Sequence, residues 1–346
     1  MTTQSWPAVI DHLVAGKDLT ADDTAWAMNQ VMAGDATPAQ IAGFAVALRA
    51  KGETPSEVVG MADAMLANAH RVDVSGPAVD IVGTGGDRSG SVNISTMASL
   101  VVAAAGVPVV KHGNRAASSK TGTADVLEAL GVAIALPPEG VRRCVQELGI
   151  GFCFAPVFHP ALRHAAGPRK ELGIPTTFNL LGPLTNPAQP SSGLVGCAYP
   201  DKLEVLAEVF ARRGASMLVV RGDDGLDELT TTTTSTVWRV SGGQATKTSI
   251  DPSALGITRA SADDLKGDEA AYNAEVVRAL VGGEKGPVRD AVVLNAAGAL
   301  AAFAGLRESL IDDLAAGLDK ATAAIDSGKT ATLLAEWAEL STRLAG

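Results

Sequence analysis

Apolar positions recur at helical spacing through residues 6 to 70 of this chain. One such face, with steps of three and four residues, is formed by Ile41, Phe44, Ala45 and Leu48. Polar helix starts interrupt the pattern, each with a threonine that can cap the helix and two with proline in the first turn: Thr20, Thr37-Pro38 and Thr54-Pro55-Ser56-Glu57. No strand pattern is evident before Val79. The sequence therefore predicts a small all-helical region here.

Beyond residue 77, short apolar runs alternate with helical patterns. We expect strands at residues 78–82, 107–110, 132–136, 150–154 and 216–220, with a further apolar run at 194–198. We expect helices from about residue 93, at 124–130, at 138–148 and up to 213, then a threonine-rich hairpin around 230–240 and a mostly helical end from about 267. A stretch dense in proline and glycine at 175–190 is typical of a hinge or domain crossing. The alternation predicts an α/β fold with a largely parallel sheet covered by helices.

The expected strand at 78–82 leads directly into Gly83-Thr84-Gly85-Gly86-Asp87, and Asn93-Ile94-Ser95-Thr96 follows at an expected helix start. α/β proteins hold phosphates with strand, glycine-rich turn and helix start in this order, because glycines let the backbone approach and the helix N-terminus favours negative charge. A glycine cluster alone is more often a simple turn. Here Asn93, Ser95 and Thr96 could cap the helix or meet phosphate or a metal.

A second polar segment follows the next expected strand: Lys111-His112-Gly113-Asn114-Arg115-Ala116-Ala117-Ser118-Ser119-Lys120-Thr121-Gly122-Thr123. It carries cations, hydroxyls and glycines at the carboxyl end of a strand, where open α/β sheets bind ligands. A merely solvated basic loop would be unusual in a chain whose net charge is −10. Together with the glycine loop, the segment indicates a ligand with more than one phosphate.

Carboxylates gather after the expected strand 216–220, in Asp223-Asp224-Gly225-Leu226-Asp227-Glu228. Such a run is by itself an ordinary acidic turn. Next to a polyphosphate site it could hold Mg²⁺ through one or two oxygens, with water or phosphate completing the coordination shell. We therefore expect a magnesium site here only in combination with the phosphate site.

A helix bearing histidine and arginine precedes the proline-rich stretch, with His159, Arg163, His164 and Arg169. A lone histidine is more often structural than catalytic. Arg169 could bind a carboxylate, because the planar guanidinium forms two parallel hydrogen bonds with one. No Ser/His/Asp, Cys/His or zinc-type arrangement is recognisable in the sequence.

The composition of the chain indicates which classes of ligand to exclude and which cellular compartment to expect. Aromatic residues make up 4% of the chain, too few for a base-stacking platform, and the net charge of −10 disfavours nucleic acid and anionic membranes. Cys144, Cys153 and Cys197 have neither disulfide nor metal-ligand spacing, which indicates free thiols in a reducing compartment. The sequence lacks a signal-peptide pattern at its start and an apolar run of membrane-spanning length. We expect a cytoplasmic protein that binds neither membrane nor nucleic acid, and its 346 residues allow two domains or one large one.

Four segments together resemble the anthranilate phosphoribosyltransferases, which share a fold with the pyrimidine nucleoside phosphorylases. They are Asp80 to Thr96 (DIVGTGGDRSGSVNIST), Lys111 to Gly131 (KHGNRAASSKTGTADVLEALG), His159 to Pro187 (HPALRHAAGPRKELGIPTTFNLLGPLTNP) and Gly225 to Leu229 (GLDEL). The resemblance implies a small helical domain, residues 1–72 joined by about 165–190, and a larger α/β domain, residues 73–164 and 191–346, with a mostly parallel central sheet flanked by helices. It also implies an active site in the cleft between the domains and a homodimer formed through the helical domain.

The resemblance further implies a reaction of tryptophan biosynthesis, in which the phosphoribosyl group of phosphoribosyl pyrophosphate (PRPP) passes to the amine of anthranilate with Mg²⁺ as cofactor. The implied PRPP ligands are Gly83, Gly86, Asp87, Ser91, Asn93, Ile94, Ser95, Thr96, Lys111, His112, Gly113, Asn114, Arg115, Ala116, Ala117, Ser118, Ser119 and Thr123. The implied Mg²⁺ ligands are Ser95, Asp227 and Glu228. The implied anthranilate contacts are Gly83, Asn114, His159 and Arg169, and the residues implied nearest the chemistry are Asp87, His112 and Arg169. Diphosphate leaves once its charge is neutralised and the amine adds from the opposite face, so positioning and charge stabilisation carry the catalysis.

Two alternatives are weighed against this function. A pyrimidine nucleoside phosphorylase would need a Lys-His-Ser-Thr-Gly-Gly type segment, whereas here Lys111-His112 runs into Gly113-Asn114-Arg115. A non-enzymatic paralogue that binds nucleic acid would need a basic face, whereas this chain is acidic and keeps Asn114 and Arg169.

Overall fold

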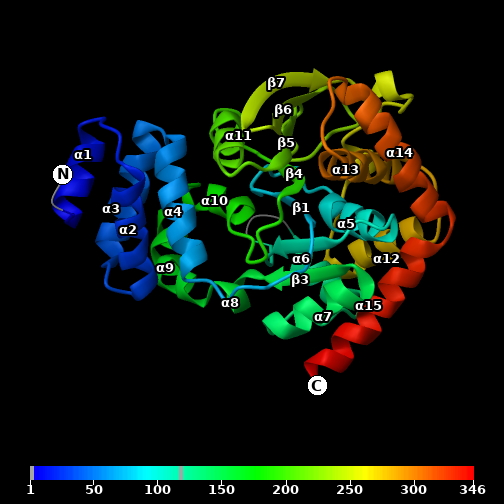
Figure 1. The fold of residues 1–346 in the computed structure, drawn as a ribbon, viewed down its shortest axis with the longest axis horizontal. Coiled ribbons are helices and arrows are strands. Elements are labelled where there is room, and N and C mark those ends of the chain that lie inside the picture. The colour runs from blue at the N-terminus through cyan, green and yellow to red at the C-terminus, as the bar shows by residue number, and fades with distance from the viewer. Residues whose placement is uncertain (1–3, 117–119) are drawn as a thin grey trace.

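The computed structural model describes residues 4–116 and 120–346. A bundle of helices forms one end of the molecule and an α/β body forms the other (Figure 1). The bundle contains α1 (Trp6–Val14), α2 (Ala21–Ala33), α3 (Pro38–Lys51) and α4 (Pro55–Ala67). As predicted, Thr20, Thr37 and Thr54 begin helices, and each forms a capping box. Each hydroxyl accepts a hydrogen bond from the backbone N–H three residues on, a donor that the helix itself cannot satisfy.

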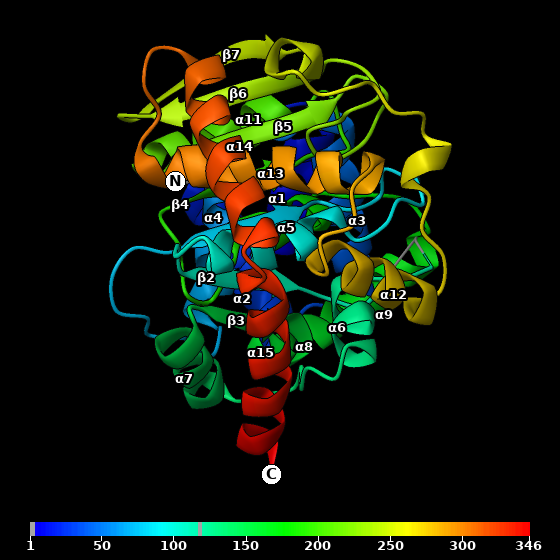
Figure 2. The same cartoon turned by 90° about the vertical axis from the view of Figure 1, so that its right-hand side faces the viewer.

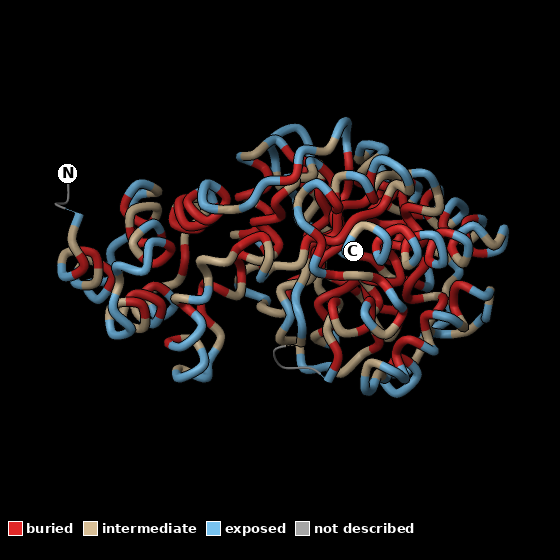
Figure 3. The backbone as a smooth tube through the Cα atoms, turned by 90° about the horizontal axis from the view of Figure 1, so that it is seen from below, coloured by how far each residue is buried: buried red, intermediate tan, exposed pale blue. Residues whose placement is uncertain are grey.

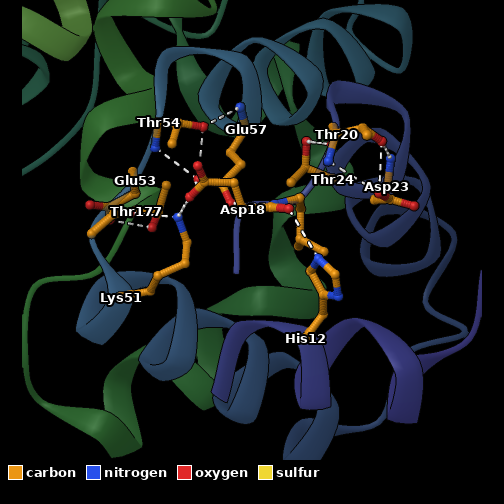
Figure 4. Close-up of polar contacts among 12 residues, drawn as sticks. His12, Asp18, Thr20, Asp23, Thr24, Lys51, Glu53, Thr54, Glu57 and Thr177 are labelled. Atoms are coloured by element: carbon orange, nitrogen blue, oxygen red, sulfur yellow. Dashed lines mark hydrogen bonds and ion pairs between the residues drawn. The ribbon is translucent and has the colours of Figure 1, made fainter. Parts of the chain in front are cut away.

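A polar cluster ties the ends of the bundle helices together (Figure 4). The Lys51 ammonium at the end of α3 donates to Asp18 Oδ1 at 2.7 Å and to Glu57 Oε2 at 2.9 Å. Glu57, buried in the first turn of α4, also accepts a hydrogen bond from the Leu19 backbone N–H at 2.9 Å. A buried carboxylate is tolerated when its charge and its lone pairs are both satisfied, as they are here. The cluster therefore fixes the connection between α1 and α2 against α3 and α4.

Among the described residues, seven strands form one sheet in the order β3-β2-β1-β4-β5-β6-β7. The strands are β1 (Val79–Gly83), β2 (Val109–Gly113), β3 (Ile150–Phe154), β4 (Ser192–Gly196), β5 (Ser216–Gly222), β6 (Ser235–Ser241) and β7 (Gln244–Ile250). β1 to β5 are parallel, and β6 and β7 extend the sheet as an antiparallel hairpin. The predicted α/β class with a mostly parallel sheet is confirmed. The strand order reverses between β1 and β4, and ligands of open α/β sheets bind at such a switch point.

Side chains of the central strands alternate between two hydrophobic cores, one on each face of the sheet. On one face, Ile81, Leu194 and Leu218 pack with α5 (Ile94–Ala104) and α13 (Pro287–Ala304). On the other face, Val195 and Val219 belong to a core that includes α11 (Leu203–Arg212) and the helical bundle. Buried segments accordingly run through both the bundle and the body (Figure 3). The bundle is packed against the sheet side of the body through α11 and α4, which contact each other.

Further helices enclose the core on the first face (Figure 2). They are α6 (Thr123–Ala129), α7 (Pro138–Leu148), α12 (Ala270–Val281), α14 (Leu310–Asp326) and α15 (Lys329–Ala345). α14 packs over α13 and α5, and α15 packs over α5 and α7. α13 is long and apolar enough to span a membrane, but 72% of that stretch is buried inside the protein. Its contacts with β4, β5 and α14 identify it as a core helix.

The chain returns to the bundle through residues 155–190. This segment contains α8 (Ala155–Phe158), α9 (Arg163–Leu172) and α10 (Phe178–Leu181), with 3₁₀ turns at Pro160–Leu162 and Gly182–Leu184. α9 packs against α2 and α3, and α10 packs against α4. The loop-rich connection that the sequence indicates therefore contains short helical turns, with α10 on the bundle and the turn Gly182–Leu184 on β1 and β2.

Three expected elements differ from the structure. Residues 132–136 form no strand in the described chain: Val132, Ile134 and Leu136 are buried against helices, and the Ala133 N–H donates to Ser341 Oγ of α15 at 2.9 Å. Their alternation reflects one-sided burial without a partner strand. β2 begins two residues later than predicted and runs on to Gly113. The hairpin lies at 235–250, because the preceding threonines bond the acidic turn, as Thr230 Oγ1 does to Asp224 Oδ2 at 2.7 Å.

Candidate active site

The carboxyl ends of β1 and β4 meet at the switch point, where Gly83 and Gly196 are paired. Asp227, from the segment after β5, lies against both. A Cβ atom on Gly83 would come within 2.3 Å of Asp227 Oδ2, and one on Gly196 within 1.5 Å of the Asp227 carbonyl oxygen. Both distances are far below van der Waals contact, so only glycine lets Asp227 approach this closely. The glycines at the two strand ends make room for a carboxylate.

The glycine loop, residues 83–87, turns sharply after β1. Gly85 and Gly86 have φ of +68° and +88°. Arg88 follows at +59°, a left-handed conformation that costs a residue with a side chain roughly 1 kcal/mol. The Gly85 N–H donates to Asp227 Oδ2 at 2.7 Å, and the Asp227 N–H donates to Asp87 Oδ2 at 3.3 Å. The glycine loop and the acidic segment, separate in the sequence, are thus joined by hydrogen bonds.

Asp87, Asp227 and Glu228 form an acidic cluster at this point. Burial raises the pKa of Asp227 well above its usual range, and the charges of Asp87 and Glu228 raise it further. Burial also raises the pKa of Glu228 to about 8, against the opposing effect of Lys111. Buried carboxylates that repel one another are stabilised by a cation. Within the described ranges no group of three His, Cys, Asp or Glu side chains is arranged to hold a metal alone, so an ion would need a hydroxyl or substrate oxygens as well.

Lys111, on β2, is 1% exposed and lies beside the acidic cluster. Its ammonium donates to the Ile81 carbonyl oxygen and, at 3.2 Å, to Ser95 Oγ. Burial lowers the pKa of Lys111, and nearby carboxylates, led by Asp80, oppose that shift. Lys111 and Ser95 therefore form the cationic and hydroxyl side of the site.

Asp80 is a residue of this network that the sequence motifs do not single out. Its Oδ1 accepts a hydrogen bond from the His112 backbone N–H at 3.2 Å, and its Oδ2 accepts one from Asn186 Nδ2 at 2.8 Å. Burial raises the pKa of Asp80 to about 6. It braces β1 against β2 and the segment after α10. The available signal was a carboxylate inside the apolar run of a buried strand.

The start of α5 carries its predicted polar residues, with roles that differ from simple capping. Asn93 is the N-cap residue, but its side chain does not cap the helix. Its amide donates to the Thr121 carbonyl oxygen at 3.2 Å, and its Oδ1 accepts from Asn273 Nδ2 at 2.9 Å. The Ser95 backbone N–H faces Glu228 and lowers the pKa of that carboxyl. The helix N-terminus is therefore directed at the acidic cluster.

Other residues predicted to hold phosphate in these segments lie nearby but are bonded or packed within the protein. Ile94 is buried in the core. The hydroxyls of Thr96 and Thr123 are 3.4 Å apart. Ser91 forms an isolated antiparallel bridge with the segment before α12, and Gly113 ends β2.

The lysine loop is described only in part: outside the described residues lie Ala117, Ser118 and Ser119. Asn114 is exposed, and its Oδ1 accepts from the Arg115 N–H at 2.7 Å. The Arg115 guanidinium pairs with Asp125 at 2.8 Å and with Glu128. The Ala116 N–H donates to Asp125 Oδ2 at 3.0 Å. Arg115 is thus held by α6, and its guanidinium is not an unpaired cation.

His112 and His159 are buried and in contact, with ring centroids 5.2 Å apart. His112 Nδ1 lies 3.0 Å from the Gly182 carbonyl oxygen, and His159 Nε2 lies 2.8 Å from that of Thr185. The other ring nitrogen of each is buried without a hydrogen-bond partner among the described residues. Burial lowers the pKa of His112 to about 3 and that of His159 to about 4. Both rings are therefore neutral at physiological pH.

Arg169, in α9, lies over the ring of Phe178, with the guanidinium carbon 5.5 Å from the ring centroid. No hydrogen bond or ion pair to this guanidinium is found in the part of the chain that the structure describes. Burial lowers the pKa of Arg169. A partly desolvated guanidinium without a counter-ion attracts a carboxylate strongly.

Tyr199, in the loop after β4, is a second residue that the motifs missed. Its hydroxyl is buried and has no hydrogen-bond partner among the described residues. A Cβ atom on Gly86 would come within 2.8 Å of it. Tyr199 belongs to no motif, and only the fold brings it to the glycine loop.

Two protein-family models match this chain, one over the helical bundle and one over the α/β body. Residues 7–69 match the glycosyl transferase family, helical bundle domain, and residues 75–331 match the glycosyl transferase family, a/b domain. The chain is 69% identical over 340 residues to the anthranilate phosphoribosyltransferase of Saccharopolyspora erythraea, covering 98% of this chain and 97% of that protein. It is 63% identical over 343 residues to the protein of the same name from Rhodococcus jostii, covering 99% and 95%.

Solved structures show the same likeness. The anthranilate phosphoribosyltransferase of Thermus thermophilus superposes with a TM-score of 0.90 at 43% identity, over 96% of this chain and 99% of that one. The Saccharomyces cerevisiae protein of that name, in complex with PRPP and Mg, superposes with a TM-score of 0.88 at 24% identity, over 98% of each chain. At that identity the yeast structure shows a shared fold.

Proposed function

The chain belongs to the anthranilate phosphoribosyltransferases of this glycosyl transferase family, and on that premise we propose how its cleft performs their reaction. The protein transfers the phosphoribosyl group of PRPP to the amine of anthranilate, giving N-(5-phosphoribosyl)anthranilate and diphosphate in tryptophan biosynthesis. The observation that carries the proposal is the hydrogen bond from the Gly85 N–H to Asp227. It supports a diphosphate and magnesium site, because an anion-binding backbone loop lies against acids that a metal can bridge.

We assign PRPP to the carboxyl edge of the sheet, with its diphosphate on the glycine loop and its ribose phosphate toward the lysine loop. The positive φ angles of Gly85 and Gly86 and the buried ammonium of Lys111 support this assignment. The proposed contacts are Gly83, Gly86, Asp87, Ser91, Asn93, Ile94, Ser95, Thr96, Lys111 to Ala116 and Thr123. Arg115, paired with acids of α6, would act by holding the lysine loop in shape. The roles of residues 117–119 rest on the sequence alone.

We assign Mg²⁺ to Ser95, Asp227 and Glu228. Their hydroxyl and carboxylate oxygens are the hard donors that Mg²⁺ prefers, and the raised pKa values of both acids indicate a cluster without enough positive charge. Bound there together with diphosphate, Mg²⁺ would neutralise charge on the leaving group.

We assign anthranilate to the face of the cleft formed by α9. Arg169 would pair with its carboxylate, because the guanidinium has no counter-ion among the described residues. Gly83, Asn114, His112 and His159 would line its path. Neutral imidazoles suit this position, because a cationic ring would compete with Arg169 for the carboxylate.

The proposed chemistry needs little proton transfer by the protein. The bond from ribose C1 to diphosphate breaks, and diphosphate takes the electron pair. The anthranilate nitrogen forms its bond to C1 from the opposite face and then loses a proton. Asp87, fixed by the Asp227 N–H, keeps a carboxylate beside the ribose, where positive charge develops.

We further propose a homodimer formed through a helical domain of residues 1–72 joined by about 165–190. The support is an apolar surface on α1 and α3: Val14 is 73% exposed, Val46 is 39% exposed, and Trp6 and Ile10 line a hollow beside Val14. We expect a dimer in analytical ultracentrifugation, and dissociation on Val14→Glu with Val46→Glu. A monomeric wild-type protein would refute this. The bounds of the α/β domain, residues 73–164 and 191–346, the cytoplasmic location and the absence of nucleic-acid and membrane partners remain our predictions.

The experiment that tests the proposed function follows the fluorescence of anthranilate in the presence of the protein, PRPP and Mg²⁺. We expect the emission to fall only when all three are present, because the product forms at the expense of free anthranilate. Emission that stays constant under saturating conditions would refute the enzyme activity. Release of free base from a pyrimidine nucleoside in the presence of inorganic phosphate would instead indicate a phosphorylase.

A further inference from the structure

The Tyr199 hydroxyl lies near the glycine loop and has no role in the proposed function. It has less than 1 Å² of exposed surface and no hydrogen-bond partner in the part of the chain that the structure describes. Burying a hydroxyl without a partner costs free energy that a phenylalanine of the same shape would not. Because buried polar groups are nearly always bonded to protein, water or ligand, this hydroxyl is available to a ligand or a water molecule.

The loop that carries Tyr199 is firmly anchored. Thr84, in the glycine loop, accepts a hydrogen bond from the Ala198 N–H at 3.0 Å and donates one to the Gly196 carbonyl oxygen at 3.0 Å. The Cys197 N–H donates to the Val220 carbonyl oxygen of β5 at 2.9 Å. The Tyr199 ring packs against the core shared by α11 and the bundle. The position of the hydroxyl therefore follows from a fixed backbone and a packed ring.

The hydroxyl is directed at the glycine loop. For a Cβ atom built on Gly86, the nearest heavy atom is Tyr199 Oη at 2.8 Å, ahead of the ring carbon Cζ at 3.7 Å. The absence of a side chain at Gly86 thus makes room for the hydroxyl beside the loop. Burial raises the pKa of Tyr199, Cys197 and Asp227 raise it further, and Arg49 and Arg88 oppose the shift. The phenol is therefore protonated at neutral pH and can donate a hydrogen bond.

We propose that Tyr199 is a further donor-binding residue, whose hydroxyl donates a hydrogen bond to a diphosphate oxygen, either of PRPP or of free inorganic diphosphate. This inference rests on the proposed function, because it requires diphosphate on the glycine loop. Such a bond strengthens as the leaving group gains charge, so it favours departure more than binding of the intact donor. A neutral donor also holds the anion without disturbing the balance between Lys111 and the acids.

The test compares Tyr199→Phe with Tyr272→Phe, which changes the only other tyrosine of the chain, an exposed residue of α12. Titration calorimetry with inorganic diphosphate and Mg²⁺ measures affinity directly. We expect Tyr199→Phe to weaken binding of diphosphate about ten- to a hundred-fold, as for a lost hydrogen bond to a charged group. It should also lower kcat and kcat/KM for PRPP while leaving KM for anthranilate unchanged. Tyr272→Phe should match the wild type.

Thermal unfolding provides a second readout that does not depend on turnover. Without ligand, Tyr199→Phe should unfold at the same temperature as the wild type or higher, and diphosphate with Mg²⁺ should stabilise it less. A lower midpoint without ligand, together with unchanged diphosphate affinity, would show a structural bond and overturn the inference. An effect confined to KM for anthranilate would overturn it too. If the wild type itself does not bind diphosphate, the donor site of the proposed function fails, whatever Tyr199 does.

Discussion

On the donor side of the cleft, Asp227 accepts a hydrogen bond from Gly85 and lies beside Glu228 and Lys111. On the acceptor side, the Arg169 guanidinium lies over the Phe178 ring and has no hydrogen bond or ion pair among the described residues. The donor side is therefore a connected network, in which changing one member disturbs its neighbours. The acceptor side presents a single charge, whose loss should affect one substrate. The difference separates variants that damage the whole site from variants that alter specificity.

The largest effect is expected from breaking the acidic end of the donor network with Asp227→Asn and Glu228→Gln together. Loss of the metal's charge stabilisation should reduce kcat/KM by about a thousand-fold. The double variant should also lose its dependence on Mg²⁺ concentration. Asp223→Asn, an exposed acid of the same segment, is the matched control and should behave as the wild type. Unchanged magnesium dependence in the double variant would remove this pair from the metal site.

The packing of the two sides is compared by adding one methyl group to each. In Gly196→Ala the Cβ would lie 1.5 Å from the Asp227 carbonyl oxygen, so the free energy of unfolding should fall by about 3 kcal/mol or more. In Gly167→Ala, within α9, the Cβ would meet nothing within 4 Å, and the helix should gain up to about 1 kcal/mol. Denaturant unfolding without ligands measures both. Equal effects would mean that Asp227 is not closely packed over the strand ends.

The acceptor side is tested by Arg169→Ala. Removing a hydrogen-bonded charge should raise KM for anthranilate about ten- to a hundred-fold, with a much smaller effect on KM for PRPP. Arg169→Lys should recover part of the loss, since an ammonium keeps the charge but not the bidentate geometry. Steady-state kinetics in which each substrate is varied in turn gives the two KM values separately. Similar increases for both substrates would contradict the carboxylate role.

The smallest effect concerns His112, on the donor-side strand β2, and His159, on the acceptor-side segment after α8. Both pKa values are lowered from 6.5, to about 3 and about 4, so the stability that the neutral rings give is complete above pH 6.5 and is lost as the pH falls. Near pH 5.5 each ring should cost about 1 kcal/mol of unfolding free energy relative to pH 8. Denaturant unfolding of His159→Gln at both pH values should show a smaller acid loss than the wild type. An equal loss would mean that His159 is not held neutral.

The sequence predicted best the features whose signals lie within a few residues. The helix starts at Thr20, Thr37 and Thr54 and the elements at 138–148 and 150–154 agree with the structure, because caps, prolines and local periodicity determine them. The strand predicted at residues 132–136 was wrong, because an alternating apolar pattern does not reveal whether a partner strand exists.

The residues of the candidate site likewise fall into those with a local sequence signal and those without one. Gly83 to Asp87, Lys111 and Asp227 stood out because glycine turns and charges near strand ends are local signals. Tyr199 and Asp80 did not, because their partners come from distant parts of the chain: Gly86 for one, His112 and Asn186 for the other. Whether an arginine is already paired with acids also determines whether it is available to bind a substrate carboxylate. Arg115 and Arg169 look alike in the sequence, yet Arg115 is bonded to acids, whereas Arg169 has no ion pair within residues 4–116 and 120–346.

The most direct measurement of the two-sided cleft is a crystal structure of the protein with Mg²⁺, inorganic diphosphate and anthranilate, which cannot react because no ribose is present. We expect diphosphate on Gly83 to Asp87, Mg²⁺ between it and Ser95, Asp227 and Glu228, and the anthranilate carboxylate on the Arg169 guanidinium. Diphosphate bound away from the glycine loop, or anthranilate bound away from Arg169, would contradict this expectation.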